Sequence, residues 1–162
     1  MPSAISRRAL LTGQLKATSP PLRPPWAIPE AQFIDACTAC SRCIKDCEEG
    51  ILKKGSGGFP EVDFSLGECT FCQRCVDACP DQALQKTATP WQLKAHINDN
   101  CLTHQHIVCL SCGENCDAQA IRFSQIGHPV AQPKIDANLC TGCGACFNPC
   151  PTQAISLCQN SI

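Results

Sequence analysis

Apolar residues come in short runs along this chain. Ile51-Leu52 and Val62-Asp63-Phe64 flank a glycine-rich turn, Gly55-Ser56-Gly57-Gly58, and so predict two short strands. Ala120-Ile121-Arg122-Phe123 and Val130 to Ile135 predict a second pair of strands. Elements this short favour a small, irregular α+β fold.

Cysteines interrupt these runs at regular spacings. The stretch from Cys69 to Pro80, CTFCQRCVDACP, has the spacing C-x2-C-x2-C-x3-C-P, which is typical of bacterial iron–sulfur proteins. Two residues between cysteines let a tight loop wrap one corner of a cubane cluster, and inward amides then tune its potential. Short helices are expected after the third cysteine of a motif, at Ile44 to Cys47 and Val76 to Cys79.

The spacing recurs, so that 16 of the 17 cysteines fall into four motifs. The motifs are Cys37, Cys40, Cys43, Cys47; Cys69, Cys72, Cys75, Cys79; Cys101, Cys109, Cys112, Cys116; and Cys140, Cys143, Cys146, Cys150. After the fourth cysteine, three motifs share Gln-Ala and an aliphatic residue. This is an internal repeat of one cluster-binding half-unit. Only Cys158 is left over, and we expect it to be a small apolar filler.

The chain has 162 residues, and cysteine supplies much of its 44% apolar content. Its hydrophobic core is therefore expected to be small and to need stabilisation by disulfides or bound metal. Disulfides fit poorly, because the cysteine count is odd and the spacing repeats. Zinc is the stronger alternative, but the third cysteine of each triplet would be surplus. We therefore expect [4Fe–4S] clusters, four in number.

The net charge of −1 and the lack of tyrosine argue against nucleic-acid binding. No uncharged apolar run is long enough to cross a bilayer, so we expect a soluble chain with no transmembrane segment, and leave peripheral membrane contact open. We find no glycine-rich phosphate loop and no Ser/His/Asp constellation, so the chain is not expected to be an enzyme.

Residues 1–30 are expected to form an N-terminal arm. Ser6 to Leu11, SRRALL, resembles the start of a twin-arginine export signal, but the apolar region that should follow is missing. A docking helix and a plain tail both stay open for it. Residues 19–29, SPPLRPPWAIP, should be extended and polyproline-like, with Trp26 folded back over the first cluster module. Trp91 should play the same covering role in the connector.

Paired motifs of this kind resemble two bacterial-type two-cluster ferredoxin modules in tandem, at residues 31–88 and 95–158, with a connector around 86–94. In that fold the fourth cysteine of each motif serves the other cluster. The resemblance therefore implies four iron-ligand sets: Cys37, Cys40, Cys43 with Cys79; Cys69, Cys72, Cys75 with Cys47; Cys101, Cys109, Cys112 with Cys150; and Cys140, Cys143, Cys146 with Cys116. Each cluster would staple both motifs of its module.

The first and third motifs depart from the ferredoxin pattern. Glu48 and Asp117 replace the proline that follows the fourth cysteine elsewhere, and we expect both carboxylates to face solvent. Seven residues, LTHQHIV, separate Cys101 from Cys109. A histidine ligand, from His104 or His106, stays open, but we expect a longer loop that returns Cys101 to the iron and leaves the histidines at the surface or in a partner site.

A closer resemblance covers nearly the whole chain. It rests on Ser6 to Gly13, Arg23-Pro24-Pro25-Trp26, Cys37-Thr38-x-Cys40, Gly57-Gly58, Glu68-Cys69, the expanded third motif and Cys140-x-Gly142-Cys143-Gly144-Ala145-Cys146. This combination resembles the NapF family of ferredoxin-type proteins in periplasmic nitrate reductase systems. The resemblance implies a cytoplasmic accessory protein that binds the catalytic molybdenum subunit before export and helps to mature its iron–sulfur cluster.

Three functions stay open from the residues alone. An assembly factor would hold its client through the leader and the RPPW segment, and at least one cluster would be labile. A multi-cluster electron carrier would keep all its clusters and act as a wire. An electron-transfer subunit of a membrane oxidoreductase would use the apolar faces of its modules as permanent interfaces. The N-terminal arm, which a wire does not need, favours the assembly factor.

Overall fold

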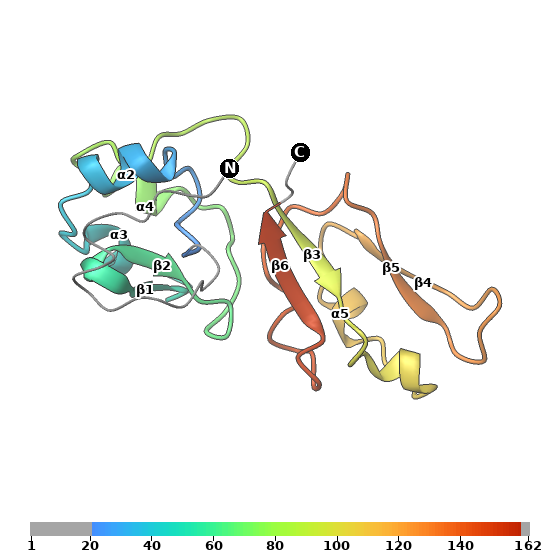
Figure 1. The fold of residues 1–162 in the computed structure, drawn as a ribbon. Helices are drawn as coiled ribbons and strands as arrows, with labels where there is room; N and C mark the ends of the chain where they lie inside the picture. The colour runs from blue at the N-terminus through green and yellow to red at the C-terminus, as the bar shows by residue number, and fades with distance from the viewer. Residues whose placement is uncertain (1–20, 160–162) are drawn as a thin grey trace, which may run out of the picture.

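The computed structural model describes residues 21–159, which fold into an N-terminal half (residues 21–88) and a C-terminal half (residues 91–159), side by side in Figure 1. The N-terminal half contains α2 (Glu30–Ala36), α3 (Arg42–Lys45), β1 (Leu52–Lys54), η1 (Ser56–Gly58), β2 (Pro60–Val62) and α4 (Arg74–Asp77). The C-terminal half contains β3 (Leu93–Ile97), η2 (Leu102–Gln105), α5 (Ser111–Glu114), β4 (Ile121–Ser124), β5 (Gln132–Ile135) and β6 (Ile155–Gln159). Within residues 21–159, no helix has the length and apolar character to cross a membrane.

Both predicted strand pairs are present. β1 pairs with β2 in antiparallel register, with Leu52 opposite Val62. β4 pairs with β5 in the same way, with Ile121 opposite Ile135. Asp63, which was expected in the strand, follows β2 but still donates its amide to the carbonyl of Ile51 (2.8 Å). The alternation of apolar residues therefore located both hairpins to within two residues.

The helices begin earlier than expected. α3 and α4 each contain the third cysteine of their motif, Cys43 or Cys75, and end before the fourth. The residue before each helix has a left-handed backbone, with φ of 64° at Ser41 and 68° at Gln73. This reversal directly after the second cysteine forces the helix to start there, so the prediction of helices after the third cysteine was wrong. α5 likewise contains the third cysteine of its motif, Cys112, but the residue before it, Leu110, has a φ of −123°.

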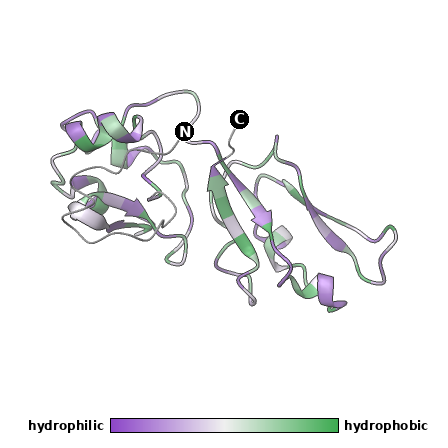
Figure 2. Ribbon diagram, viewed as in Figure 1, coloured by the Kyte–Doolittle hydropathy of each residue, from purple (hydrophilic) through white to green (hydrophobic). Residues whose placement is uncertain are grey.

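A third antiparallel pair, β3 with β6, was not predicted. Its register runs from Leu93 opposite Gln159 to Ile97 opposite Ile155, and Figure 2 shows apolar residues along much of β6. Burial alternates along β3, because Leu93 and Ala95 are buried while the residue between them is more exposed. β3 thus begins inside the stretch that the sequence assigned to the connector.

The N-terminal half has a reduced version of this pair. Ala27 and Leu84 form an isolated antiparallel bridge. The amide of Ile28 donates to the carbonyl of Ala83 (3.1 Å), just as that of Asn98 donates to Ala154 (2.8 Å). The proline-rich stretch therefore takes, in the first half, the place of β3 in the second.

Trp26 is buried, as predicted, at 7% exposure. Its indole N–H donates to the carbonyl of Thr87 (3.0 Å), and its ring lies edge-on to that of Phe71 (6.4 Å between centroids). The segment is not extended throughout, because it turns at Pro25-Trp26 and Trp26 has a φ of 63°. Burial against the first half outweighs the polyproline preference here. The arginine pair of the leader lies outside the described residues.

Aromatic rings join the two halves. Phe64 packs against Trp91 and Phe147, with centroids 5.8 and 6.5 Å apart. The indole N–H of Trp91 donates to the carbonyl of Thr141 (3.1 Å) in the C-terminal half. Trp91 therefore has the covering role expected of it, and it also holds the halves together.

Candidate metal centres

The repeated residues after each fourth cysteine form a turn. The third residue after that cysteine always has a left-handed backbone: φ is 65° at Gly50, 53° at Gln82, 49° at Gln119 and 51° at Gln153. The two residues that follow it are buried in all four repeats. The Gln-Ala-aliphatic repeat thus reverses the chain behind the cysteine and returns it to the core.

Three of the cavities in the structure are each lined by four cysteines. We call them the second set (Cys47, Cys69, Cys72, Cys75), the third set (Cys101, Cys109, Cys112, Cys150) and the fourth set (Cys116, Cys140, Cys143, Cys146). Each set combines three cysteines of one motif with the fourth cysteine of the other motif in the same half. This is the exchange that the ferredoxin resemblance implies.

The first set (Cys37, Cys40, Cys43, Cys79) shows the same association through its electrostatics. Burial raises the pKa of Cys43 to about 11, and the thiolates of the other three cysteines raise it further. Burial also raises the pKa of Cys37, with added contributions from Cys79 and Cys40. The structure thus brings together all four sets; that each one ligates a cluster stays a prediction.

The chemistry of the sets suits a cationic metal group. Burial raises the pKa of Cys69, Cys75 and Cys146 to about 12, and that of Cys112 to about 11, with neighbouring thiolates adding to the effect. Four thiolates placed this close repel one another, so they are stable only beside compensating positive charge, such as iron. Metal binding at these sets should therefore release protons.

Within residues 21–159, no three Cys, His, Asp or Glu side chains converge on a point that would suit a single metal ion. A cubane makes a different demand, because each of its four cysteines binds a separate iron at its own corner. The two observations are therefore compatible.

Adjacent sets lie close together at three places. Burial is the largest cause of each raised pKa, but the thiolate of Cys43 also raises the pKa of Cys75, and that of Cys112 raises the pKa of Cys146. Between the halves, the amide of Cys69 donates to the carbonyl of Cys143 (2.8 Å). The sets therefore form a series in the order first, second, fourth, third.

The cysteine loops of the first, second and fourth motifs share a backbone shape. Two residues in each loop have positive φ: Ala39 and Ser41, Phe71 and Gln73, Gly142 and Gly144. Only the fourth motif uses glycine at both positions. A Cβ at Gly142 would lie 2.6 Å from the carbonyl oxygen of Leu93, and one at Gly144 would clash with the ring of Phe64. Packing against β3 within the C-terminal half thus explains Gly142, and the junction between the halves explains Gly144.

The expanded third motif returns Cys101 to its set. Thr103 of η2 is buried, and the side-chain amide of Gln132 donates to its carbonyl (2.7 Å). This contact fixes the extra loop against β5, so that Cys101 lines the same cavity as Cys109. His104 and His106 are exposed and are not among the residues that line it.

Sequence reasoning missed three hydroxyl groups beside the third set. Thr103, Ser111 and Thr152 lie with their hydroxyl oxygens 3.3, 3.7 and 3.9 Å from the sulfurs of Cys101, Cys109 and Cys150, respectively. Each lies two residues after its cysteine, so the pattern C-x-[ST] was the available signal.

Two expectations about other residues had different outcomes. Glu48 and Asp117 are exposed, as predicted. Cys158 is also exposed, on β6 opposite Lys94, so its role as an apolar filler was wrong. Ile155, at the start of β6, is buried, and exposure increases along the strand toward residue 158.

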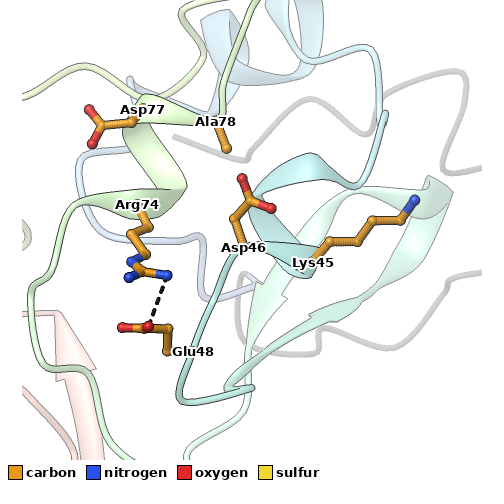
Figure 3. A pocket seen from close by; sticks show the side chains of 6 residues that line it. All are labelled: Lys45, Asp46, Glu48, Arg74, Asp77 and Ala78. Carbon is orange, nitrogen blue, oxygen red and sulfur yellow. Dashed lines mark ion pairs between the residues drawn. The ribbon is translucent and has the colours of Figure 1, made fainter.

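Figure 3 shows a surface hollow between α3 and α4, lined by Lys45, Asp46, Glu48, Arg74, Asp77 and Ala78. Glu48 and Arg74 form an ion pair across it (2.8 Å), with both side chains more than half exposed. No cysteine lines this hollow, so it is separate from the four sets.

The sequence matches two family models, a 4Fe-4S dicluster domain over residues 36–84 and a 4Fe-4S binding domain over residues 133–156. It is 41% identical to the ferredoxin-type protein NapF of Escherichia coli K12, over 93% of each chain. It is 47% identical to NapF of Haemophilus influenzae, over 84% of this chain and 78% of that one.

A further relative is the methylamine utilization ferredoxin-type protein MauM of Methylophilus methylotrophus. The identity is 31%, over 88% of this chain and 72% of the relative. The domain matches, the cysteine sets and the near full-length similarity agree with one another. This chain is an iron–sulfur protein with 4Fe–4S-binding domains, and it belongs to the NapF family of ferredoxin-type proteins.

Proposed function

We propose that this chain is a four-cluster accessory protein of a periplasmic nitrate reductase system. In this proposal two tandem two-cluster modules, residues 31–88 and 95–158, follow an N-terminal arm, and each cysteine set holds one [4Fe–4S] cluster. The observation that carries it is the exchange of fourth cysteines in all four sets. A bound [4Fe–4S] cluster supplies a one-electron redox couple. The chain itself is not an enzyme.

The accessory role is that of a cytoplasmic protein that binds the catalytic molybdenum subunit and assists its iron–sulfur maturation before export. Similarity to NapF over 93% of the chain supports it. The RPPW segment does not offer a free surface for the client. Pro24, Pro25 and Trp26 are buried, and the side chain of Arg23, which is 10% exposed, pairs with Glu30 (2.7 Å) of its own half. We therefore place client contact elsewhere than on this segment.

The serial order of the sets favours a second candidate, an electron carrier. The hydrogen bond between the amide of Cys69 and the carbonyl of Cys143 gives a short covalent and hydrogen-bonded route between sulfurs of the two halves. A protein that only presented a folded surface to a client would not need its two halves joined at ligand positions.

Iron content tests the cluster count. The loaded chain, purified without oxygen, should hold about sixteen irons. Replacing one proposed ligand, as in Cys79→Ser, should lower that number by about one cluster, whereas Cys158→Ser is the matched control and should leave it unchanged. Equal iron in the Cys79→Ser and control variants would contradict the ligand sets.

Mixing tests the role. The loaded chain and the cluster-free, unexported catalytic subunit are combined anaerobically and separated, and iron and sulfide are measured on each. Complex formation with iron moving to the catalytic subunit supports maturation. If the two neither bind nor exchange iron, while the reduced chain passes electrons to other acceptors, the electron carrier is the correct function.

A further inference from the structure

The third set differs from the others in what touches its sulfurs. The hydroxyl oxygen of Thr103 lies 3.3 Å from the sulfur of Cys101, that of Ser111 lies 3.7 Å from Cys109, and that of Thr152 lies 3.9 Å from Cys150. Three of the four cysteines in this set therefore have a hydroxyl neighbour. The amide of Ala154 also donates to the sulfur of Cys150 (3.2 Å).

The printed sequence shows the same restriction. Among the sixteen cysteines of the four sets, only Cys101, Cys109 and Cys150 are followed two residues later by serine or threonine. Hydroxyls near the first set are directed elsewhere: Thr38 donates to the carboxylate of Asp81 (2.6 Å) and Ser41 to the carbonyl of Ala39 (3.3 Å). In the described chain, the hydroxyl–sulfur contacts thus belong to the third set.

Thr103 is held in place by a buried network. Its exposure is 1%, and that of Gln132 is 8%. The Gln132 amide nitrogen donates to the Thr103 carbonyl, which turns the amide oxygen toward the Thr103 hydroxyl (3.0 Å). The Thr103 hydroxyl donates its single proton to this oxygen, so it has no proton left for the Cys101 sulfur beside it.

A cysteine that binds iron has lost its thiol proton and can only accept hydrogen bonds. The hydroxyls of Ser111 and Thr152 then become donors to the ligand sulfurs, whereas that of Thr103 stays bonded to Gln132. Reduction adds one negative charge to a cluster and its ligands, so donors aimed at the sulfurs stabilise the reduced state more than the oxidised one. The physical consequence is a higher reduction potential at the set that has them.

We propose that Ser111 and Thr152 raise the reduction potential at the third set above that at the other three, so that the first electron to enter the chain resides there. The proposal rests on the proposed occupancy of all four sets. The event is the transfer of one electron from an external one-electron reductant, and no bond is formed or broken. Since the third set ends the series, the electron resides at one end of the chain.

The test uses the loaded full-length chain under anaerobic conditions, titrated with dithionite and followed by electron paramagnetic resonance. In the unmodified chain the first signal to appear should belong to the third set, as shown by its altered shape in Cys112→Ser. In the double variant Ser111→Ala, Thr152→Val, that signal should move to lower potential. The other signals should stay in place, and Thr103→Ser, which keeps the hydroxyl bonded to Gln132, should leave the potential unmodified.

The matched control changes two hydroxyls near the first set that donate elsewhere: Thr38→Val and Ser41→Ala. An unchanged third-set potential in the double variant, or an equal shift in the control, overturns the proposal. If the double variant loses iron, Ser111→Ala and Thr152→Val are titrated singly; a lowered potential supports the proposal, and no shift in either overturns it. Failure of the proposed occupancy is distinguishable, because the unmodified chain would then contain less iron than four clusters require.

Discussion

The two halves hold equivalent cysteine sets within different cores. In the N-terminal half the buried residues include three large aromatic side chains, Trp26, Phe33 and Phe64. In the C-terminal half the main buried cluster consists of Ala95, Ile121, Cys146 and Ile155, with no large aromatic side chain among them. A large aromatic core buries much more apolar surface than a few small aliphatic residues. The second half therefore depends more on its metal groups for stability.

Backbone strand pairing, unlike aromatic packing, is more extensive in the C-terminal half. The C-terminal half has two ladders, β3 with β6 and β4 with β5, whereas the N-terminal half has the three-residue β1–β2 ladder and one bridge. Short two-stranded ladders are only marginally stable without packing on one face. The comparison teaches that one repeated motif can be stabilised in two ways. One is the packing of large side chains, and the other is strand pairing that is held together by bound clusters.

Removing the iron should produce the largest difference in stability between the two halves. After anaerobic chelation, amide hydrogen exchange in β3–β6 should speed up by more than about 100-fold, since metal-binding free energy is folding free energy in such sites. The amides of Ile28 and Gln85, which bond across the first half, should keep more protection. Equal loss of protection in both halves would remove the distinction.

Core truncations sharpen the comparison. Phe33→Ala should cost about 3–5 kcal/mol of unfolding free energy, because this ring is fully buried. Ile155→Ala should cost about 2–5 kcal/mol in the loaded chain but little in the cluster-free chain, in which the second half has already opened. Denaturant unfolding of both variants, with and without iron, measures this. A full cost for Ile155→Ala without iron would show that the second half has an independent core.

The junction can be broken at Gly144. An alanine Cβ there would clash with the ring of Phe64, and φ is 88°. Gly127→Ala is the matched control, because Gly127 also has positive φ (78°) but no heavy atom near its added Cβ. The control should cost about 1–2 kcal/mol from backbone strain, and Gly144→Ala about 1–3 kcal/mol more from overpacking. Faster exchange of the Cys69 amide would report junction opening, and equal costs in both variants would exclude the clash.

A surface pair gives the smallest effect. Hydrogen bonds from Lys53 and Ser65 lower the pKa of Asp63 from 3.8 to about 2. A lowered pKa means that this contribution is fully present above about pH 4 and is lost as the pH falls toward 2. Lys53→Met should move the Asp63 midpoint back toward 3.8, as followed by carboxyl carbon NMR shifts. A midpoint that does not move would assign the effect to Ser65 alone.

Local patterns predicted much of the molecule. The spacing of the cysteines gave the four motifs, the ferredoxin resemblance implied the four sets, and short apolar runs gave both hairpins. Long-range partners account for what was missed. The proline-rich stretch reads as extended, but the bridge from Ala27 to Leu84 decides its shape. The exposure of Cys158 depends likewise on the pairing of β6 with β3, which nothing near residue 158 indicates.

The β3–β6 pairing has a consequence for biosynthesis. Chains fold from the N-terminus as they leave the ribosome. Every cysteine of the first and second sets has been synthesised by the time the chain reaches Trp91. β3 follows at once, but its partner begins only at Ile155. During translation the cell therefore holds a finished first half beside an open second half. The machinery that inserts iron and sulfide therefore encounters the first and second sets before the third and fourth sets, which are filled last.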